Sequence, residues 1–400
     1  MKVLYITTED FSITNANNHL NLSLIEGILK LGNEVMLIQS KTDNVDNTPQ
    51  LLKSYENFSS ISVLRKKVNK NNLFKRWYEE NTFYKRAIKE AKHIKCDVVF
   101  YQSSRDSSSF VLRIKKTLKK PVLLNIQDIF PDSLVSTGAV KIKPIISYFE
   151  NKQRKMYKKV DCITVLSQDM KNTLIKKGVD DKKIFIAYNW FEKDQIKEIG
   201  IQQNKFAKKY NLSKEKFIVQ YAGNLGFVIN YDVFIEVAKR LIDYKNIELQ
   251  IVGNGSQEEK FKKTVLENGL SNVKFFPMQP LELVSDVYSY CDVCLIPLKH
   301  GVIYHSVPSK ASIVMACKRP IILSCDKSYY MDLFLKSNIE YAFECTEYEK
   351  IANQVIELSK AGMDDEMINR AYEYVNENFS QEKNTKLIIE LLENISEKGE

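Results

Sequence analysis

Short apolar runs typical of buried strands alternate with amphipathic helical stretches along the whole 400-residue chain. This alternation is typical of a parallel sheet covered by helices, because each strand needs a crossover before the next parallel strand. The strands expected in the first half are 3–6, 34–39, 61–64, 98–101, 122–126, 162–166 and 184–187. Those expected in the second half are 217–221, 247–252, 273–276, 293–296, 321–324 and 340–343. The pattern predicts two doubly wound α/β domains, joined by the polar segment from about 190 to 216.

A proline, a hydroxyl and a lysine open an apolar helical stretch at Val307-Pro308-Ser309-Lys310. Proline fits the first helical turn, and the free N–H groups and the dipole at a helix N-terminus favour a phosphate. Ser309 and Lys310 could contact the same anion. Pro-Ser at a helix start is also ordinary capping, so the pattern by itself leaves both interpretations open.

Glycine-containing turns follow two neighbouring strands of the second half. Gly223-Asn224-Leu225-Gly226 comes after the first strand, and Gly253-Asn254-Gly255 ends the second. Glycine lets the backbone approach a ligand closely. Ligands of open α/β sheets bind at the carboxyl edge, where both turns are expected. The sequence therefore predicts a phosphate-type site in the second domain.

The composition favours a soluble cytoplasmic enzyme. Hydrophobic residues make up 44% of the chain, yet no apolar run approaches the roughly 20 residues of a membrane span. The first residues, 1–7, are typical of a strand and not of a signal peptide. The seven cysteines are scattered, as expected for reduced thiols. Cys291 and Cys294 have C-x-x-C spacing, but no second pair or nearby histidine completes a metal site, so we expect no metal.

The net charge of +9 is concentrated in the first half of the chain. Residues 66–95 interleave lysines and arginines with aromatic side chains, Lys75-Arg76-Trp77 among them. This combination is typical of a surface that docks on an anionic membrane. An aromatic stripe facing the core, with a solvated basic back, would give the same pattern. No nucleic-acid-binding module is recognisable, and we expect no nucleic-acid partner.

Six motifs, taken in order, resemble the family 4 glycosyltransferases of GT-B fold. The motifs are Gln127–Ser133, Tyr188–Trp190, Tyr221–Gly226, Ile251–Gly255, Cys291–Lys299 and Val307–Lys310. The resemblance spans nearly the full chain, and it looks closest to the branch that builds bacterial capsule and O-antigen repeat units, which includes N-acetyl-L-fucosamine transferases.

The resemblance implies two Rossmann-like domains that face each other across a cleft. Residues 1–190 would bind the acceptor, and a C-terminal helix over about 382–400 would pack back on them. Residues 191–381 would bind the nucleotide sugar. The implied reaction moves N-acetyl-L-fucosamine or a related N-acetylamino sugar from a UDP donor, with retention and without a metal or other cofactor. The implied acceptor is linked to undecaprenyl diphosphate at the inner face of the plasma membrane.

The same resemblance assigns roles to individual residues. Asn224, Gly226, Ser309 and Lys310 would contact the diphosphate, with Lys299 as a further cation, and Gly253 would let the donor approach. The segment Pro277-Met278-Gln279 would offer backbone groups to the nucleobase, and Gln127 and Asp128 would face the sugar or the acceptor. Lys310 and Asp128 would be catalytic. A capping or turn carboxylate is the alternative for Asp128. His19, His300 and His305 are expected to be solvated loop residues or local caps.

Four positions depart from the wider family pattern. His305 and Ile313 stand where many members have two glutamates, Phe227 replaces a basic residue, and Gln127 replaces a histidine. These departures leave two alternatives open. One is a catalytically silent subunit that binds a nucleotide sugar. The other is a nucleotide-sugar epimerase on the same fold, although that chemistry needs acid and base residues that a chain with four histidines offers sparingly.

Overall fold

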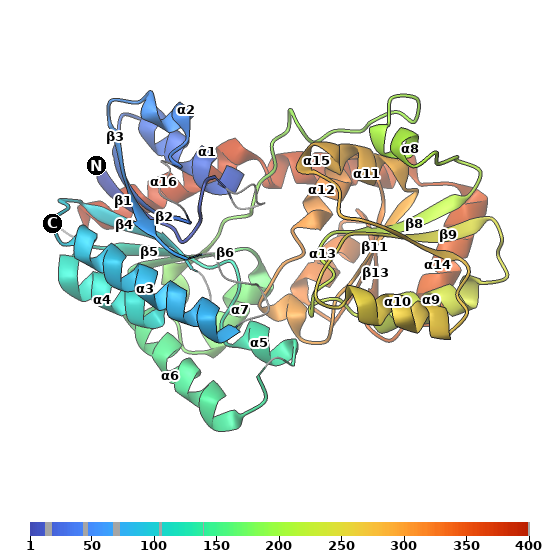
Figure 1. Ribbon diagram of the computed structural model, residues 1–400, viewed down its shortest axis with the longest axis horizontal. Coiled ribbons are helices and arrows are strands. Elements are labelled where there is room, and N and C mark those ends of the chain that lie inside the picture. The colour runs from blue at the N-terminus through green and yellow to red at the C-terminus, as the bar shows by residue number, and fades with distance from the viewer. Residues whose placement is uncertain (13–17, 43–46, 67–72, 104–105, 139, 399–400) are drawn as a thin grey trace. The chain divides into compact units, whose positions relative to one another are not determined.

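The computed structural model describes residues 1–12, 18–42, 47–66, 73–103, 106–138 and 140–398. The chain divides into two compact units (Figure 1). The first unit comprises Met1–Ser133, Lys141–Asn189 and Gln381–Glu400. The second comprises Leu134–Val140 and Trp190–Ser380.

The first unit is built on a parallel sheet of seven strands in the order β3-β2-β1-β4-β5-β6-β7. Its strands are β1 (Lys2–Ile6), β2 (Glu34–Lys41), β3 (Phe58–Leu64), β4 (Val98–Gln102), β5 (Val122–Asn125), β6 (Cys162–Val165) and β7 (Ile184–Ile186). Its helices are α1 (Asn18–Lys30), α2 (Gln50–Lys53), α3 (Leu73–Ala91), α4 (Ser108–Leu118), α6 (Lys143–Lys159), α7 (Gln168–Lys176), the 3-10 helix η1 (Asp181–Lys183) and α16 (Gln381–Glu397). Helix α5 (Asp132–Ser136) spans a boundary between the units.

The second unit has a parallel sheet of six strands in the order β10-β9-β8-β11-β12-β13. Its strands are β8 (Phe217–Ala222), β9 (Ile247–Val252), β10 (Val273–Phe276), β11 (Val293–Pro297), β12 (Ile321–Cys325) and β13 (Tyr341–Glu344). Its helices are α8 (Lys205–Lys209), α9 (Tyr231–Leu241), α10 (Glu258–Glu267), η2 (Leu281–Leu283), α11 (Val284–Tyr290), η3 (Val302–Tyr304), α12 (Lys310–Ala316), α13 (Tyr329–Lys336), α14 (Tyr348–Ala361) and α15 (Asp365–Asn378).

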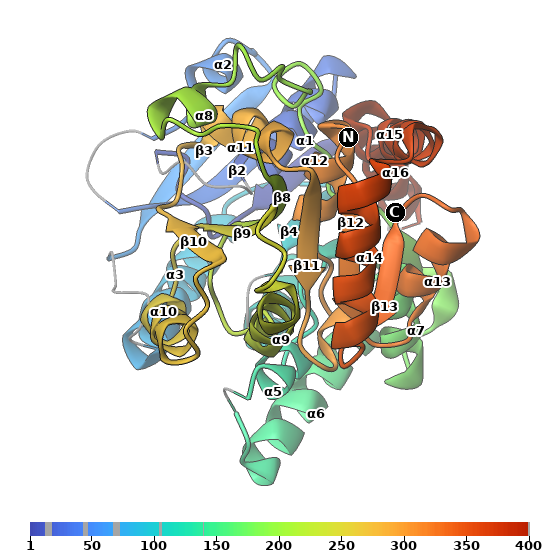
Figure 2. The same cartoon turned by 90° about the vertical axis from the view of Figure 1, so that its right-hand side faces the viewer.

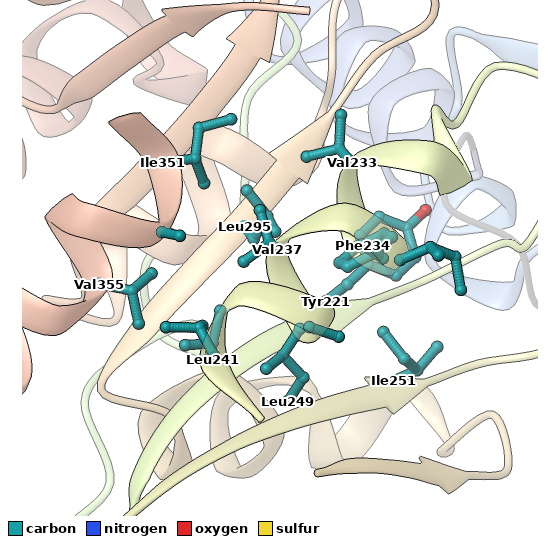
Figure 3. Close-up of a cluster of buried hydrophobic side chains, with 14 of the residues drawn as sticks. Tyr221, Val233, Phe234, Val237, Leu241, Leu249, Ile251, Leu295, Ile351 and Val355 are labelled. Atoms are coloured by element: carbon teal, nitrogen blue, oxygen red, sulfur yellow. The ribbon is translucent and has the colours of Figure 1, made fainter. Parts of the chain in front are cut away.

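The predicted strands are all present, and their ends lie within three residues of the predicted ones. Helices cover both faces of each sheet, so most strand residues are buried and the strands are continuous apolar runs. In the second unit, residues of α9, α10 and α14 share a hydrophobic cluster with one face of the sheet, centred on Val237, Leu249 and Leu295 (Figure 3). Helices α11, α12 and α15 lie on the other face (Figure 2).

Helix α16 belongs to the first unit, although it is the last element of the chain. It packs against α1 and against β4, β5 and β6. The side chain of Asn384, buried on this helix, accepts a hydrogen bond from the backbone N–H of Tyr188 at 2.8 Å. The end of the chain therefore closes the face of the first sheet.

The polar segment 190–216, which leads from the first sheet to the second, is part of the second unit. Trp190 and Phe206 are buried, at 5% and 0% exposure. The buried side chain of Asn204 donates to the carbonyl of Asp286 on α11 at 2.7 Å. A few buried apolar side chains are enough to pack this mostly polar segment against the second unit. The average polarity of the segment does not reveal them.

In both sheets, acidic residues that directly precede one strand accept hydrogen bonds from backbone N–H groups at the start of a neighbouring strand. The pairs are Asp97 with Lys2 at 2.6 Å, Asp161 with Val122 at 2.8 Å, Asp292 with Ile218 at 2.7 Å, and Glu340 with Ile321. These N–H groups lie at the amino edge of the sheet, where the ladder offers no partner. The carboxylates therefore complete the hydrogen bonding of strand ends.

Candidate functional site

The strand order of the second sheet reverses between β8 and β11, because the chain continues from β8 to β9 on one side and returns to β11 on the other. Ligands of open α/β sheets bind outside the carboxyl ends of the strands at such a point. The turn Gly223–Gly226 follows β8, and Lys299 follows β11. The backbone N–H of Lys299 donates to the carbonyl of Val228 at 2.9 Å, so the chain segments after both strands lie side by side.

The two glycine turns of this edge pack backbone against backbone. The N–H of Gly223 donates to the carbonyl of Val252 at 2.8 Å. A Cβ atom on Gly253, whose φ is +157°, would lie 1.9 Å from the carbonyl oxygen of Gly223. A Cβ on Gly255 would lie 2.3 Å from that of Leu225. Gly253 and Gly255 are thus required by contact between the turns, whereas an approach of the donor to Gly253 stays a prediction.

Three tyrosine hydroxyls from three different elements bind carbonyls of the segment 222–226. The pairs are Tyr221 with Asn224 at 2.9 Å, Tyr231 with Gly226 at 2.9 Å, and Tyr288 with Ala222 at 3.0 Å. Burial raises the pKa of each phenol, so the hydroxyls stay protonated and act as donors. The glycine turn is therefore held rigid from β8, α9 and α11.

Lys310, the first residue of α12, extends to the same turn. Its Nζ donates to the Tyr221 hydroxyl at 2.7 Å and lies 4.1 Å from the centroid of the tyrosine ring. The same Nζ is 2.8 Å from where a Cβ on Gly223 would be. Burial lowers the pKa of Lys310 to about 8, although the neighbouring Cys294 opposes the shift. The two motifs singled out in the sequence therefore meet in space.

The remaining predicted phosphate contacts lie around this lysine. Ser309 is the N-cap of α12, is exposed, and makes no capping hydrogen bond with its side chain. The ordinary capping alternative is therefore not realised at Ser309. Asn224 is exposed, and its Nδ2 would be 2.8 Å from a Cβ on Gly226, so glycine at 226 makes room for the asparagine side chain.

Met278 and Gln279 follow β10, at the same edge of the sheet. The N–H of Gly253 donates to the carbonyl of Phe276 at 2.9 Å, which brings this segment beside the second glycine turn. Met278 is 42% exposed. Gln279 is engaged, because it accepts from Lys209 at 3.0 Å and donates to the carbonyl of Pro277 at 2.6 Å. The segment is thus a fixed loop whose backbone borders the site.

The carboxyl edge of the first sheet carries Gln127 and Asp128 after β5. The Gln127 amide donates to Asn125 at 2.6 Å and accepts from Asn189 at 2.7 Å, and Asn125 in turn donates to Thr164 at 2.9 Å. Gln127 therefore links the ends of β5, β6 and β7. Asp128 is exposed and bonds no described residue, so the capping alternative for it is not realised.

The expectation of solvated loop residues or local caps fits the individual histidines in different ways. His305 is only 5% exposed and so is not solvated, but it is the C-cap of η3, where its backbone N–H donates to the carbonyl of Val302 at 3.1 Å. His19 lies in the first turn of α1. His300 is exposed and pairs with Asp326, which also accepts from the N–H of Gly301 at 2.6 Å. Asp326 therefore ties the loop after β11 to the end of β12.

Two family models match nearly consecutive parts of the chain. The Glycosyltransferase Family 4 model matches residues 19–195, and the model for glycosyl transferases group 1 matches residues 202–375. The fold agrees, since a sucrose-phosphate synthase of Thermosynechococcus elongatus superposes with a TM-score of 0.78 at 14% identity, over 98% of both chains. The chain belongs to the GT-B glycosyltransferases.

Curated relatives and a further structure are similar to this glycosyltransferase. WcaI of Escherichia coli, named for colanic acid biosynthesis, is 28% identical over 48% of this chain, and WbjE of Pseudomonas aeruginosa is 26% identical over 51%. The chain spans about half the length of the curated relatives it matches, 48% and 51%. HepE of Anabaena, solved with UDP and glucose, has a TM-score of 0.70 at 13% identity, over 98% of this chain and 100% of its own.

The basic aromatic stretch, residues 66–95, contains both exposed and buried aromatic side chains. On α3, Trp77 and Tyr78 are 49% and 59% exposed, whereas Phe83 and Tyr84 are buried. Lys75 is exposed, and the side chain of Arg76 lies outside the described residues, as do residues 67–72. The core interpretation therefore holds for the later turns, and an exposed aromatic pair remains on the first ones.

A second exposed apolar group lies at the start of α6. Ile142, Ile145 and Tyr148 are 59%, 41% and 59% exposed. Exposed cations lie beside them in the sequence at Lys141 and Lys143, and further along the same helix at Arg154 and Lys155. This end of α6 extends beyond the other elements of the first unit in both views (Figures 1 and 2). We call these residues the α6 surface; the sequence showed its charge but not its exposure.

Within the described ranges, no helix of the glycosyltransferase combines the length and apolarity needed to cross a bilayer. The same residues contain no group of three or more His, Cys, Asp or Glu side chains arranged to hold a metal ion. Six of the seven cysteines are buried, and burial raises the pKa of Cys291 to about 12, so this thiol stays protonated.

The sequence did not single out the three tyrosines. Tyr221 belongs to the apolar run of a buried strand, and Tyr231 and Tyr288 lie on apolar helix faces. In the sequence each therefore resembles an ordinary core aromatic residue. Only their hydroxyls distinguish them, because a buried phenol must find a partner. A strand tyrosine two residues before a glycine turn is the one signal that could have drawn attention to Tyr221.

Proposed function

We propose that this chain transfers a sugar from a UDP-linked donor, held at the carboxyl edge of the second sheet, to a lipid-linked acceptor in polysaccharide biosynthesis. The observation that carries the proposal is the meeting of Lys310 with the Gly223–Gly226 turn at the point where the strand order reverses. A rigid backbone turn beside a half-buried cation suits a diphosphate, and relatives named for glycosyl transfer support the same conclusion.

Lys310 is proposed to act on the departing diphosphate. As the bond between the anomeric carbon and the phosphate oxygen breaks, negative charge grows on the diphosphate, and a fixed ammonium lowers that barrier. The acceptor hydroxyl forms the new bond on the same face of the sugar, and its proton passes to the leaving phosphate. This route gives retention and uses no metal and no further cofactor.

The other residues receive supporting roles. Asn224, Gly226, Ser309 and Lys299 are proposed to contact the diphosphate, and Met278 and Gln279 to border the nucleobase. Gln127, locked in its network, is proposed to hold Asp128 toward the sugar or acceptor. UDP as the nucleotide is supported by HepE, which was solved with UDP and glucose. N-acetyl-L-fucosamine or a related N-acetylamino sugar is our proposal for the sugar.

The decisive test has two parts. The first measures thermal stabilisation by UDP, GDP and UDP-N-acetylamino sugars in the wild type and in Lys310→Ala. The second measures UDP release with and without a lipid-linked acceptor. We expect stabilisation by UDP compounds that the variant loses, and UDP release only when the acceptor is present. Binding without acceptor-dependent release would favour a silent nucleotide-sugar-binding subunit. Conversion of the donor without release of UDP would favour an epimerase.

For the acceptor end we propose that the first unit docks on an anionic membrane at the inner face of the plasma membrane, where an undecaprenyl-diphosphate-linked acceptor would lie. Lys75, Arg76 and Trp77 on α3 form one candidate surface, and the α6 surface forms the other. Exposed aromatic and aliphatic side chains can enter the headgroup region while the cations meet anionic lipid.

Sedimentation with vesicles of phosphatidylglycerol and phosphatidylcholine tests this docking. We expect Ile145→Glu, and Trp77→Ala with Lys75→Gln and Arg76→Gln, each to reduce the bound fraction. Leu266→Glu is the matched control, because Leu266 is an 81% exposed apolar residue of the second unit. If all variants bind vesicles like the wild type, membrane docking by these surfaces is wrong.

A further inference from the structure

Tyr221 occupies a special place between the turn and the lysine. Its hydroxyl is 2.7 Å from Nζ of Lys310 and 2.9 Å from the carbonyl oxygen of Asn224. An ammonium can only donate and a carbonyl can only accept. The phenol must therefore accept from Lys310 and give its single proton to Asn224, so the direction of both hydrogen bonds is fixed.

The ring that carries this hydroxyl cannot easily move. Tyr221 is fully buried in the hydrophobic cluster of the second unit, and its ring packs edge-on against Phe234 at 5.6 Å between centroids (Figure 3). The ammonium of Lys310 also lies above the ring face, where a cation is attracted. The lysine is thus held by a rigid side chain at the edge of a packed core.

Stabilising the turn does not by itself require this arrangement. Tyr231 and Tyr288 bind Gly226 and Ala222 of the same turn, and neither has a contact to Lys310. We propose that Tyr221 is a positioning residue, which holds the Lys310 ammonium over Gly223 at the place where the donor diphosphate binds. The proposal rests on the proposed function of this edge as the donor site.

The arrangement has a consequence for pH. Burial lowers the pKa of Lys310 to about 8, so the lysine loses its charge in a mildly alkaline solution. The titratable groups that face it, Tyr221 and Cys294, have pKa values raised by burial and stay neutral there. A diphosphate binds the charged lysine better. The contribution of Lys310 to the affinity for UDP should therefore be constant well below pH 8, and above it the affinity should fall by up to about tenfold per pH unit.

The hydroxyl of Tyr221 accepts a hydrogen bond from the charged form of Lys310. Removing the hydroxyl in Tyr221→Phe removes that stabilisation, so the lysine loses its proton at lower pH. We expect Tyr221→Phe to bind UDP several-fold more weakly at pH 7.5 and to move the midpoint of the pH dependence down by about half a unit to one unit. A residue that only supported the fold would not move this midpoint.

The test is isothermal titration calorimetry of the full chain with UDP between about pH 6.5 and 9.5, in the wild type and four variants. Tyr231→Phe is the matched control, because it removes a hydroxyl bond to the same turn without touching the lysine, and we expect it to keep the wild-type midpoint. Lys310→Arg keeps a charge that does not titrate, so the midpoint should disappear. Lys310→Ala should bind UDP weakly at every pH. Because it lacks the lysine, any change of its affinity with pH reports the titration of UDP itself.

The outcomes separate the two proposals. If Tyr221→Phe and Tyr231→Phe both keep the wild-type midpoint while Lys310→Ala loses affinity, the donor site stands and the positioning role of Tyr221 is wrong. A midpoint that persists in Lys310→Arg also overturns the positioning proposal, because the titrating group is then not Lys310. If Lys310→Ala binds UDP like the wild type, the proposed donor site itself fails. Near-ultraviolet circular dichroism checks the fold of each variant.

Discussion

The carboxyl edges of the two sheets are built on the same architecture but organised in different ways. In the second unit, three phenols and two packed glycine turns fix a backbone segment, and a lysine points at it. In the first unit, an amide network linking β5, β6 and β7 fixes Gln127, and the neighbouring carboxylate of Asp128 is exposed. One edge places a cation against a rigid turn, while the other exposes a carboxylate to solvent.

The difference shows what each edge can do before a ligand arrives. A fixed cation beside a rigid turn needs little reorganisation if a diphosphate binds there, and a fixed charge of this kind stabilises charge that develops in a transition state. A carboxylate that is exposed and has no partner among the described residues can change its contacts when a substrate binds. We therefore expect substitutions in the second unit to affect turnover and folding more strongly than those in the first.

The largest effect is expected for Lys310→Ala. Loss of the cation should lower turnover by about 2 to 4 kcal/mol of transition-state stabilisation. It should leave the fold intact, since Tyr221 is the only described residue that the lysine side chain hydrogen-bonds. Steady-state kinetics of UDP release with a lipid-linked acceptor measures the change. Wild-type turnover in this variant would show that Lys310 has no role in the mechanism, and the functional contrast between the two edges would then fail.

Gly253→Ala should damage the second unit next most strongly. Its Cβ would lie 1.9 Å from the carbonyl oxygen of Gly223, which is backbone and cannot move aside without moving the turn. We expect a loss of about 3 kcal/mol in the free energy of unfolding, measured by urea denaturation.

Gly269→Ala is the control for Gly253→Ala. Gly269 also has a positive φ, of +63°, but nothing lies within 4 Å of its Cβ position. Backbone strain alone should cost about 1 kcal/mol. Equal losses in both variants would show that the packing of the two turns contributes little.

In the first unit, Asp128→Asn should reduce turnover by about tenfold and leave stability unchanged, because the carboxylate bonds no described residue. Gln127→Leu gives the opposite profile, since it breaks the amide network and should lower the urea midpoint. The two variants together test whether Gln127 has a structural role in positioning Asp128, and whether Asp128 takes part in the transfer reaction. Loss of stability in Asp128→Asn would contradict the assignment.

The smallest effect concerns the amino edge. Asp161 and Asp292 have lysines beside them, at Lys115 and Lys214, whereas Glu340 is buried and has no ion-pair partner among the described residues. Burial raises the pKa of Glu340 well above its usual value of 4.5. In the unfolded chain Glu340 ionises first as pH rises, so the contribution of Glu340 to wild-type stability falls above about pH 4.5.

Glu340→Gln removes this loss, because an amide oxygen can accept the N–H of Ile321 without ionising. We expect it to match the wild type near pH 4 and to exceed it by about 1 kcal/mol in free energy of unfolding at pH 7. Urea denaturation at the two pH values is the measurement. A gain of equal size at both would show that ionisation of Glu340 is not the cause.

Local sequence was sufficient to predict the strands, the alternation of elements and the two motifs that meet at the carboxyl edge of the second sheet. Apolar runs report burial on both faces of a sheet, and Gly223–Gly226 and Pro308–Lys310 have turn and helix-start chemistry that is visible in a few neighbouring residues. The burial of Trp190, Phe206 and His305 was not predictable in this way, because it depends on elements far along the chain.

The sequence by itself therefore determined that the chain forms two parallel α/β units and which residue types stand at the strand ends. Only the tertiary structure decided that Lys310 rests on Tyr221 and Gly223, which are separated from it by 89 and 87 positions, and that Gly253 is needed to accommodate Gly223. The reason is physical. Strand and helix periodicity are local properties, whereas a hydroxyl between a lysine and a carbonyl exists only once β8, β9 and α12 have been packed together.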